Sequence, residues 1–263
     1  MNNKKITGSL RILSLAPSVS SILCAIGAKK LLVGVTKWCK EVAPVSALPQ
    51  VGDCWSGDIQ EMLALQPTLV IGSVPYRQET VGKLLEHPLT FLAMNPRSLA
   101  DVESDIRLLG RIVDRAPQAG KLVAHMRDAF AALAKKSKRA KRRPRVYCEA
   151  WPNPRISSPP WVAELVKIAG GEMPVPAGQR VTDAQVAEAQ PAVIVLAWAA
   201  TGEKTKPQKA YAVAAWKNVP AIRDKRVYVI SDELLNTPGP PLVKGARELL
   251  RILQELPARR ARS

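Results

Sequence analysis

Apolar segments that read as strands alternate with amphipathic segments that read as helices, and this alternation limits the possible fold more than any other feature of the chain. In the first half, short apolar runs predict strands at 11–16, 31–36, 68–73 and 89–95. Amphipathic segments between them predict helices at 18–26, 58–67 and 77–87. Strands that alternate with helices favour a parallel sheet covered by helices, and therefore an α/β fold.

A second α/β pattern follows Pro144. It predicts strands at 145–151, 192–198 and 226–231, and helices at 159–171, 182–191, 212–219 and 240–256. The two halves also share a local plan. The segments "DIQEMLALQPTLVIG" and "TDAQVAEAQPAVIVLA" each read as a helix cap, an amphipathic helix, Gln-Pro and a buried strand, with Asp58 capping the first helix and Thr182 or Asp183 the second. This internal similarity supports two related lobes.

A long helical segment separates the two patterns. From Ser98, apolar residues recur at helical spacing, and Pro117 then suits the first turn of a further helix that runs into a basic stretch. We therefore expect an N-terminal α/β lobe at 9–115, a connecting helix at 116–143 and a C-terminal α/β lobe at 144–263. A helix of that length is suited to spanning two lobes rather than covering one sheet.

The charge of the chain is strongly basic. It has 263 residues, 47% of them hydrophobic, and a formal net charge of +17. Such a balance is compatible with nucleic acid or another anionic partner. Much of the excess, however, lies in the run from Lys135 to Arg145 and in the C-terminal tail, and basic runs of this kind are usually solvated. Nucleic-acid binding is therefore not expected.

The N-terminal apolar segment does not read as an export signal. Arg11 precedes the apolar run and Pro17 divides it, whereas a signal needs an uninterrupted apolar core. The segment reads better as a strand followed by a helix that Ser18 or Ser20 caps and Gly27 ends. No segment is apolar enough to span a membrane. The chain as given is thus expected to be cytoplasmic, or periplasmic if its native N-terminus precedes this sequence.

Cysteine and histidine offer little for metal binding. None of the four cysteines forms a CxxC pair, and the two histidines, His87 and His125, are not near them in sequence. No metal site is therefore predicted.

The order of several segments resembles the class of ABC-transporter substrate-binding proteins with a helical backbone, which bind vitamin B12, haem or ferric siderophores. The resemblance covers about 11–256 and is carried by "RILSLAPSVSSILCAIGA", "DIQEMLALQPTLVIG", "WVAELVKIAGGE", "VTDAQVAEAQPAVIVLAW" and "NTPGPPLVKGARELL". It implies a class III periplasmic-binding-protein fold, with two Rossmann-like lobes joined by one long α-helix. The segment "YCEAWPNPRISSPPWVAELVKIAGG" is most similar to the cobalamin-binding branch.

The resemblance implies a monomeric, non-catalytic protein that holds cobalamin or a related corrinoid between its lobes and works with an ABC permease. In α/β proteins, ligands bind beyond the carboxyl ends of the strands. Five of the six tryptophans fall at such positions or in the loops that follow, and their rings would suit a flat macrocycle. The predicted ligand-binding residues are Trp38, Cys54, Trp55, Tyr76, Trp151, Trp161, Trp198 and Leu234.

Three alternatives remain open at this point. A ferric siderophore would require cationic side chains, for which Arg77, Arg155 and Arg180 are candidates. Haem would require an axial ligand, for which Tyr76 is the best placed residue. A cytoplasmic corrinoid-handling factor would use a cysteine, Cys54 or Cys39.

Family members dock on their membrane partner through one exposed glutamate on each lobe. By this resemblance Glu79 is the N-lobe residue, and Glu233 lies close to the C-lobe position, where Asn236 aligns best. No GxSxG, P-loop or strand-linked GxGxxG motif is present, and neither histidine follows a strand. A binding protein without catalytic residues and without a catalytic cofactor is therefore favoured over an enzyme.

Overall fold

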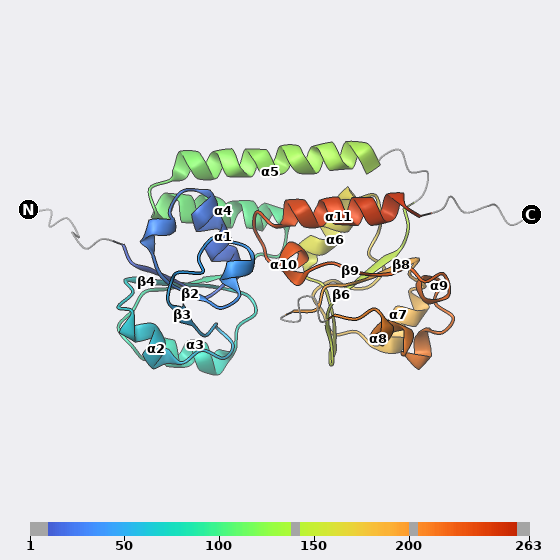
Figure 1. The fold of residues 1–263 in the computed structure, drawn as a ribbon, viewed down its shortest axis with the longest axis horizontal. Coiled ribbons are helices and arrows are strands. Elements are labelled where there is room, and N and C mark those ends of the chain that lie inside the picture. The colour runs from blue at the N-terminus through green and yellow to red at the C-terminus, as the bar shows by residue number, and fades with distance from the viewer. Residues whose placement is uncertain (1–9, 138–142, 200–204, 257–263) are drawn as a thin grey trace, which may run out of the picture. The chain divides into compact units, whose positions relative to one another are not determined.

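The computed structural model describes residues 10–137, 143–199 and 205–256 (Figure 1). The chain divides into two compact units. The N-terminal unit contains Met1–Pro96 and Ala100–Val123, and the C-terminal unit contains Arg97–Leu99 and Ala124–Ser263. Much of the basic run that starts at Lys135, and the whole C-terminal tail from 257, lie outside the described residues.

The N-terminal unit is built on a five-stranded sheet in which every neighbouring pair is parallel. The strand order is β3-β2-β1-β4-β5. The strands are β1 (Ile12–Ser14), β2 (Leu32–Thr36), β3 (Gln50–Val51), β4 (Leu69–Ser73) and β5 (Phe91–Met94). Strand β3 lies between the predicted strand at 31–36 and the predicted helix at 58–67, where the sequence pattern predicts no strand.

Helices cover both faces of this sheet, as Figure 1 shows for α1 and α4 on one face and α2 and α3 on the other. They are α1 (Pro17–Ala25), α2 (Ile59–Ala64), α3 (Gln78–Leu85) and α4 (Leu99–Ile112), with 3-10 turns η1 (Lys29–Leu31) and η2 (Cys39–Glu41). Since side chains alternate between the faces of a strand, Leu13 and Leu15 point to the side of α2 and α3, where they meet Met62 and Leu84 in a buried cluster.

The C-terminal unit has a four-stranded sheet of order β7-β6-β8-β9. The strands are β6 (Val146–Pro152), β7 (Arg155–Ser157), β8 (Val193–Leu196) and β9 (Val227–Val229). Strands β6, β8 and β9 are parallel, whereas β7 returns antiparallel to β6 as a short hairpin that the sequence pattern does not predict.

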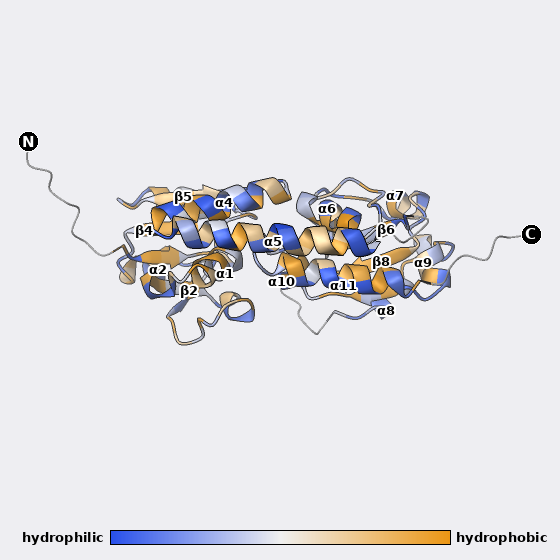
Figure 2. Cartoon of the chain, turned by 90° about the horizontal axis from the view of Figure 1, so that it is seen from above, coloured by the Kyte–Doolittle hydropathy of each residue, from blue (hydrophilic) through white to orange (hydrophobic). Residues whose placement is uncertain are grey.

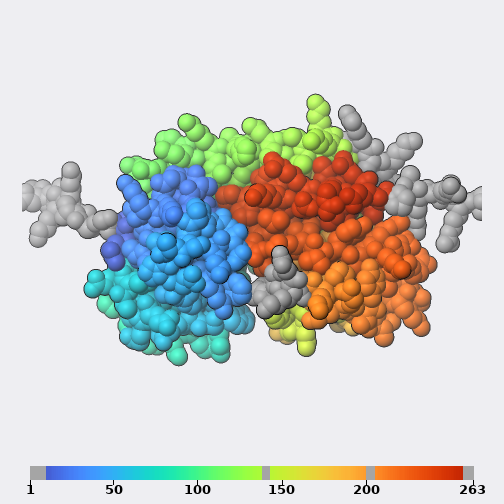
Figure 3. Space-filling view, viewed as in Figure 1, coloured from blue at the N-terminus to red at the C-terminus, as the bar shows by residue number. Residues whose placement is uncertain are grey.

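The helices of this unit are α6 (Pro160–Ile168), α7 (Asp183–Glu188), α8 (Gln208–Tyr211), α9 (Pro220–Arg223), α10 (Asp232–Leu235) and α11 (Leu242–Gln254), with a 3-10 turn η4 (Ala214–Trp216). Helix α11 is amphipathic, with hydrophobic and hydrophilic turns visible in Figure 2. It buries Leu242, Leu249 and Ile252, and its outer side lies at the surface (Figure 3). The helix predicted at 212–219 is wrong in extent, because the chain there makes only η4.

Helix starts follow local capping chemistry in two of three predicted cases. Asp58 caps α2 by accepting a hydrogen bond from the Gln60 N–H, and Thr182 forms a full capping box with Gln185 at α7. The predicted cap of α1 by Ser18 or Ser20 is wrong. The cap position is Ala16, and Pro17 occupies the first turn, where its missing N–H costs nothing.

Helix α5 (Ala116–Ser137) begins in the N-terminal unit and ends in the C-terminal unit. It corresponds to the helix predicted at 116–143, whose residues 138–142 lie outside the described part of the chain. The expected α/β architecture with parallel-rich sheets is thus confirmed in both units. Among the described residues, none of the helices combines the length and the apolar composition that crossing a membrane requires.

Candidate functional site

The loops beyond the carboxyl ends of parallel strands are the natural place for a ligand in each unit, because their backbone is not committed to the sheet. In the N-terminal unit, Trp38 follows β2 at the start of η2. Its ring is partly buried, and the Lys37 ammonium lies 4.7 Å from the ring centroid. The Trp38 ring is therefore partly accessible and carries a positive charge on one face.

Trp55 is the most exposed of the predicted ligand residues. A tight turn after β3 presents it, in which the Asp53 carboxylate accepts hydrogen bonds from the N–H groups of Trp55 (3.0 Å) and Ser56 (2.9 Å). The ring is 53% exposed, and the Trp55 carbonyl accepts a hydrogen bond from the Thr80 hydroxyl at 3.2 Å. The backbone of this turn is fixed while the indole itself remains available to a ligand.

Cys54, in contrast, is buried. Burial, followed by the nearby charge of Asp53, raises the pKa of its thiol to about 12. Its carbonyl accepts a hydrogen bond from the Arg77 N–H at 3.2 Å, which connects the Trp55 turn to the start of α3. The thiol is consequently neutral at physiological pH and is neither a thiolate nucleophile nor a ready metal ligand.

Tyr76 lies just beyond β4 and packs with Cys54 around Gly72. A Cβ atom at Gly72 would lie 2.6 Å from the Cys54 sulfur and 3.1 Å from the Tyr76 ring, so only glycine fits there. The Tyr76 hydroxyl donates to the Met94 carbonyl at 2.9 Å, and its ring meets Phe91 edge-on. Burial raises the pKa of Tyr76 well above its ordinary value.

An open, mainly apolar hollow of about 280 Å³ lies beside Tyr76. It is lined by Tyr76, Gln78, Val81, Phe91 and Ala93. The structure therefore brings Cys54 and Tyr76 into contact at one end of the sheet, where the neighbouring Trp55 is exposed.

In the C-terminal unit, Trp151 is the exposed tryptophan. It lies near the end of β6 at the turn into β7, and its ring is 39% exposed. The indole N–H donates to the Asn153 carbonyl at 2.8 Å, which folds the ring over its own turn.

Trp161 and Trp198 differ from Trp151 because the core encloses them. Trp161 is only 2% exposed and donates its indole N–H to the Leu235 carbonyl at 2.8 Å, and Trp198 is 4% exposed within the cluster of β6 and β8. The prediction that these two rings form ligand walls is corrected in this structure, since neither has a free face. Leu234, beside Leu235, is partly buried.

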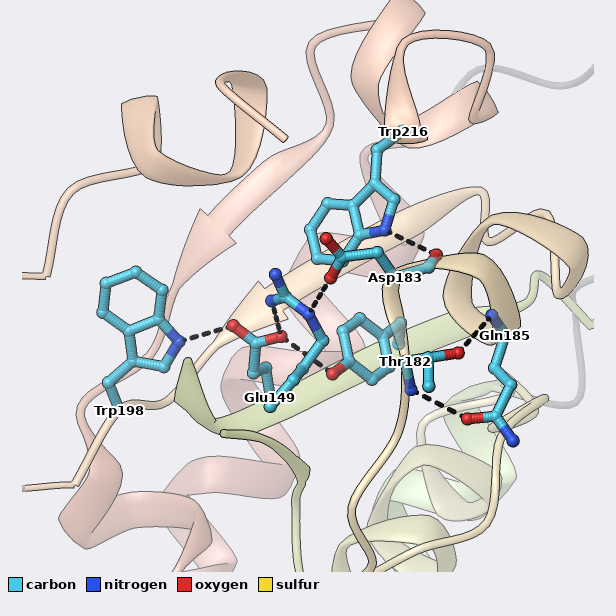
Figure 4. Close-up of polar contacts among 8 residues, drawn as sticks. Glu149, Thr182, Asp183, Gln185, Trp198 and Trp216 are labelled. Atoms are coloured by element: carbon cyan, nitrogen blue, oxygen red, sulfur yellow. Dashed lines mark hydrogen bonds and ion pairs between the residues drawn. The ribbon is translucent and has the colours of Figure 1, made fainter. Parts of the chain in front are cut away.

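Sequence reasoning missed a charged cluster around Glu149, beside Trp198 (Figure 4). Glu149 in β6 is fully buried, and Figure 4 shows its carboxylate beside the Trp198 indole. The other carboxylate oxygen pairs with the Arg155 guanidinium. The signal was present in "VYCEAW", because a carboxylate inside an apolar strand requires partners. Of the three arginines considered for an anionic ligand, Arg155 is thus paired with Glu149, Arg77 is paired with Glu79, and Arg180 is exposed.

The two predicted docking glutamates have different surroundings. Glu79 is exposed near the start of α3, where a hydrogen bond from its own N–H and then the Arg77 guanidinium, 3.1 Å away, lower the pKa of its carboxyl. Glu233, in α10, is partly buried and accepts a hydrogen bond from the Ser231 hydroxyl.

A metal-binding cluster of three or more His, Cys, Asp or Glu side chains does not occur within 10–137, 143–199 and 205–256. His87 follows α3 and precedes β5, so it lies at the amino end of its strand, opposite to the loops described above. The other histidine, His125, is in the middle of α5.

Comparison with known proteins gives a consistent result. The periplasmic binding protein family matches residues 12–234. The ABC transporter substrate-binding lipoprotein YvrC of Bacillus subtilis is 25% identical over 252 residues, which cover 91% of this chain and 78% of the relative. A vitamin B12-binding protein of Vibrio parahaemolyticus is 25% identical over 240 residues, which cover 88% of this chain and 84% of the relative.

Solved structures share the fold. The periplasmic haem-binding protein RhuT from Roseiflexus sp. RS-1 superposes with a TM-score of 0.78 at 23% identity, covering 93% of this chain and 98% of the other. The periplasmic vitamin B12-binding protein BtuF of Vibrio cholerae gives a TM-score of 0.73 at 20% identity, covering 93% and 96%. At these identities the likeness concerns the fold, and it includes binders of two different macrocycles.

Proposed function

Since the chain belongs to the periplasmic binding protein family, we propose that it binds cobalamin or a related corrinoid and delivers it to the permease of an ABC transporter. The family consists of non-catalytic substrate-binding proteins for ABC uptake, so the resemblance seen in the sequence and the expectation of a binder rather than an enzyme are confirmed. Its members are periplasmic or extracellular, which does not support the cytoplasmic location expected from the sequence. We accordingly propose a site of action outside the cytoplasmic membrane.

The observation that carries the corrinoid proposal is the chemistry around Tyr76. The exposed indole of Trp55 belongs to the same unit as this neutral, hydrogen-bonded phenol, and the neighbouring Cys54 thiol is also neutral. Such a surface gains binding energy by covering apolar area, at about 25 cal/mol per Å². A corrinoid suits it because its cobalt is already held by the ring and its own axial groups and requires no ligand from the protein.

Haem is the second candidate. It is favoured by the position of Tyr76 beyond β4 and by structural neighbours that are named as haem-binding proteins. Haem iron usually takes an axial ligand from the protein. The Tyr76 hydroxyl donates to the Met94 carbonyl and its pKa is raised, so it would first have to break this hydrogen bond and lose its proton.

The other two alternatives have less support. A ferric siderophore would need several free cationic groups, whereas Arg77 and Arg155 are already paired with carboxylates and of the three candidates only Arg180 is left. A thiol-dependent corrinoid factor would need an ionised cysteine, whereas burial keeps Cys54 protonated.

The test is a calorimetric titration of the protein with cyanocobalamin, haemin and a ferric siderophore, with tryptophan fluorescence as a second readout. We expect saturable binding of cyanocobalamin that weakens in Trp55→Ala and Trp151→Ala. Tyr211→Ala is the matched control, because Tyr211, at the end of α8, is also an exposed aromatic residue and is not one of the predicted ligand-binding residues. Binding of haemin alone, lost in Tyr76→Phe, would replace the corrinoid proposal by haem.

Glu79 and Glu233 remain the proposed docking residues for the permease. Because Glu79 is exposed and ionised, its replacement by glutamine is expected to weaken association with the permease. The affinity for cyanocobalamin should stay unchanged in the same variant. A parallel loss of ligand affinity would show that Glu79 has another role.

A further inference from the structure

The buried carboxylate of Glu149 receives hydrogen bonds from three side chains. The Trp198 indole N–H donates to one oxygen at 2.9 Å, and the Tyr147 hydroxyl donates to the other at 2.8 Å. The Arg155 guanidinium donates to that same second oxygen. These donors come from β6 itself, from β7 and from the segment after β8, so one side chain connects three parts of the sheet's carboxyl edge.

Arg155 extends this connection to α7. Its Nε donates to the Asp183 carboxylate at 2.7 Å, and its guanidinium stacks on the Trp216 ring with 4.2 Å between Cζ and the ring centroid. Asp183 is the first residue of α7, directly after the Thr182–Gln185 capping box that Figure 4 shows beside it. Burial opposes the charge of Arg155, but Glu149 and then Asp183 outweigh it and raise the arginine's pKa.

The backbone of β6 is irregular next to Glu149, at the point where the strand leads to Trp151. The register of β6 with β7 is irregular, because Glu149 is opposite Ser157 while Trp151 is opposite Ile156. Such a bulge bends a strand and changes the direction of the side chains beyond it. Trp151 lies just beyond the bulge, and Arg155 returns from the far strand of the hairpin to bind Glu149 across it.

A buried ion pair is rarely retained for stability alone, since desolvation offsets much of its attraction, and one of its uses is to select a single geometry. We propose that Glu149 and Arg155 are positioning residues that set the orientation of the Trp151 hairpin for ligand binding. This inference rests on the proposed function, because it assigns to the pair the preorganisation of the ligand-side ring of Trp151. Preorganisation raises affinity by reducing the ordering that binding must impose.

The test uses Arg155→Lys, which keeps the charge but removes the planar fork that reaches both carboxylates. Arg251→Lys is a matched control, because Arg251 also bridges two carboxylates, Glu248 and Glu255, on the exposed side of α11. The backbone hydrogen bond from Val181 to the Arg155 carbonyl is unaffected, so the hairpin should still fold. We expect Arg155→Lys to weaken cyanocobalamin binding by about tenfold and Arg251→Lys to leave it unchanged.

Fluorine NMR of the protein labelled with 5-fluorotryptophan separates this inference from the proposed function. The six tryptophans give six resonances, which single Trp→Phe variants assign. Without any ligand, Arg155→Lys should shift or broaden the Trp151 and Trp198 resonances and leave those of Trp38 and Trp55 in place. If wild type binds no cyanocobalamin, the proposed function fails, and these spectra alone then decide the positioning. The positioning role is overturned if the Trp151 and Trp198 resonances do not move in Arg155→Lys. It is also overturned if wild type binds cyanocobalamin and Arg155→Lys binds it with the same affinity.

Discussion

The carboxyl edges of the two sheets hold their aromatic residues by different means. In the N-terminal unit, Trp55 is carried by an exposed turn that the Asp53 carboxylate holds, and Tyr76 is held by a neutral hydrogen bond to the Met94 carbonyl. In the C-terminal unit, a fully buried carboxylate and its arginine connect the segments that carry Trp151 and Trp198.

Two units with similar local sequence patterns can therefore hold the aromatic residues at the carboxyl edges of their sheets in different ways. Backbone turns tolerate small movements of a side chain, whereas a buried charge with several donors tolerates few, since each lost partner leaves a desolvated group. We therefore expect the N-terminal edge to adapt to a ligand and the C-terminal edge to keep one geometry.

The largest effect is expected for Glu149→Leu. This change removes the carboxylate to which the buried Tyr147 hydroxyl and the Trp198 N–H donate, which is also one of the two carboxylates of Arg155. The free energy of unfolding should fall by about 3 kcal/mol, as for other broken buried pairs. In the N-terminal unit, Asp53→Ala should cost only about 1 kcal/mol, because its hydrogen bonds are exposed. Urea denaturation measures both, and equal losses would contradict the distinction between the two edges.

Cys54 provides the next test, through the pH dependence of stability. Its pKa is about 12 in the folded protein and 9.0 ordinarily, so the folded form keeps a proton that the unfolded chain releases above pH 9. The resulting stability is fully present below pH 9 and is lost as the pH rises toward 12. At pH 10.5 the loss from this group is about 2 kcal/mol. Cys54→Ala should therefore lose less stability than wild type between pH 8 and 10.5.

A control for this measurement is Cys24→Ala, because Cys24 is partly exposed and the Lys29 charge opposes the rise that burial causes in its pKa. Its alkaline stability profile should stay close to that of wild type. Identical profiles for wild type and Cys54→Ala would mean that the N-terminal edge does not hold a neutral thiol.

Gly72→Ala tests the close packing under Tyr76. The new methyl group would lie 2.6 Å from the Cys54 sulfur, so the neighbouring side chains must move, at a cost of about 1–3 kcal/mol. Gly82→Ala in α3 is the matched control, because nothing lies within 4 Å of its Cβ position and alanine is the better helix former by about 0.5–1 kcal/mol. Thermal unfolding should move in opposite directions for the two variants; a shared direction would show that Gly72 has room.

The strands and most helices follow from alternation and periodicity, since long apolar runs leave few other ways to bury their surface. The short edge strands β3 and β7 do not, because two or three residues inside a Pro-containing loop carry no periodic signal. Helix boundaries were predicted where a side chain caps them, at Asp58 and Thr182, and missed at α1, where Pro17 alone marks the start.

Position after a strand located the aromatic residues but not their orientation. Trp151 lies near the end of β6 and Trp161 at the start of the next helix, α6. The Trp151 ring is exposed, whereas the Trp161 ring is buried and donates its N–H to the Leu235 carbonyl. That outcome depends on α10, which is distant in sequence. The burial of Glu149 was similarly foreseeable as a demand for partners, whereas the identity of Arg155 depends on the hairpin that returns it to the same carboxylate.

The smallest effects on stability are expected at two corresponding helix starts, those of α2 and α7. Asp58 accepts one hydrogen bond at α2, whereas Thr182 takes part in a reciprocal pair at α7 that also fixes Asp183 beside Arg155. Asp58→Ala should cost about 0.5–1 kcal/mol and Thr182→Ala about 1–2 kcal/mol. Native-state hydrogen exchange should locate each loss in its own helix. Because α7 holds one end of the Arg155 cluster, Thr182→Ala should also move the Trp151 fluorine resonance, while Asp58→Ala should not. A Trp151 signal that responds to neither variant would separate the capping of α7 from the geometry of the C-terminal edge.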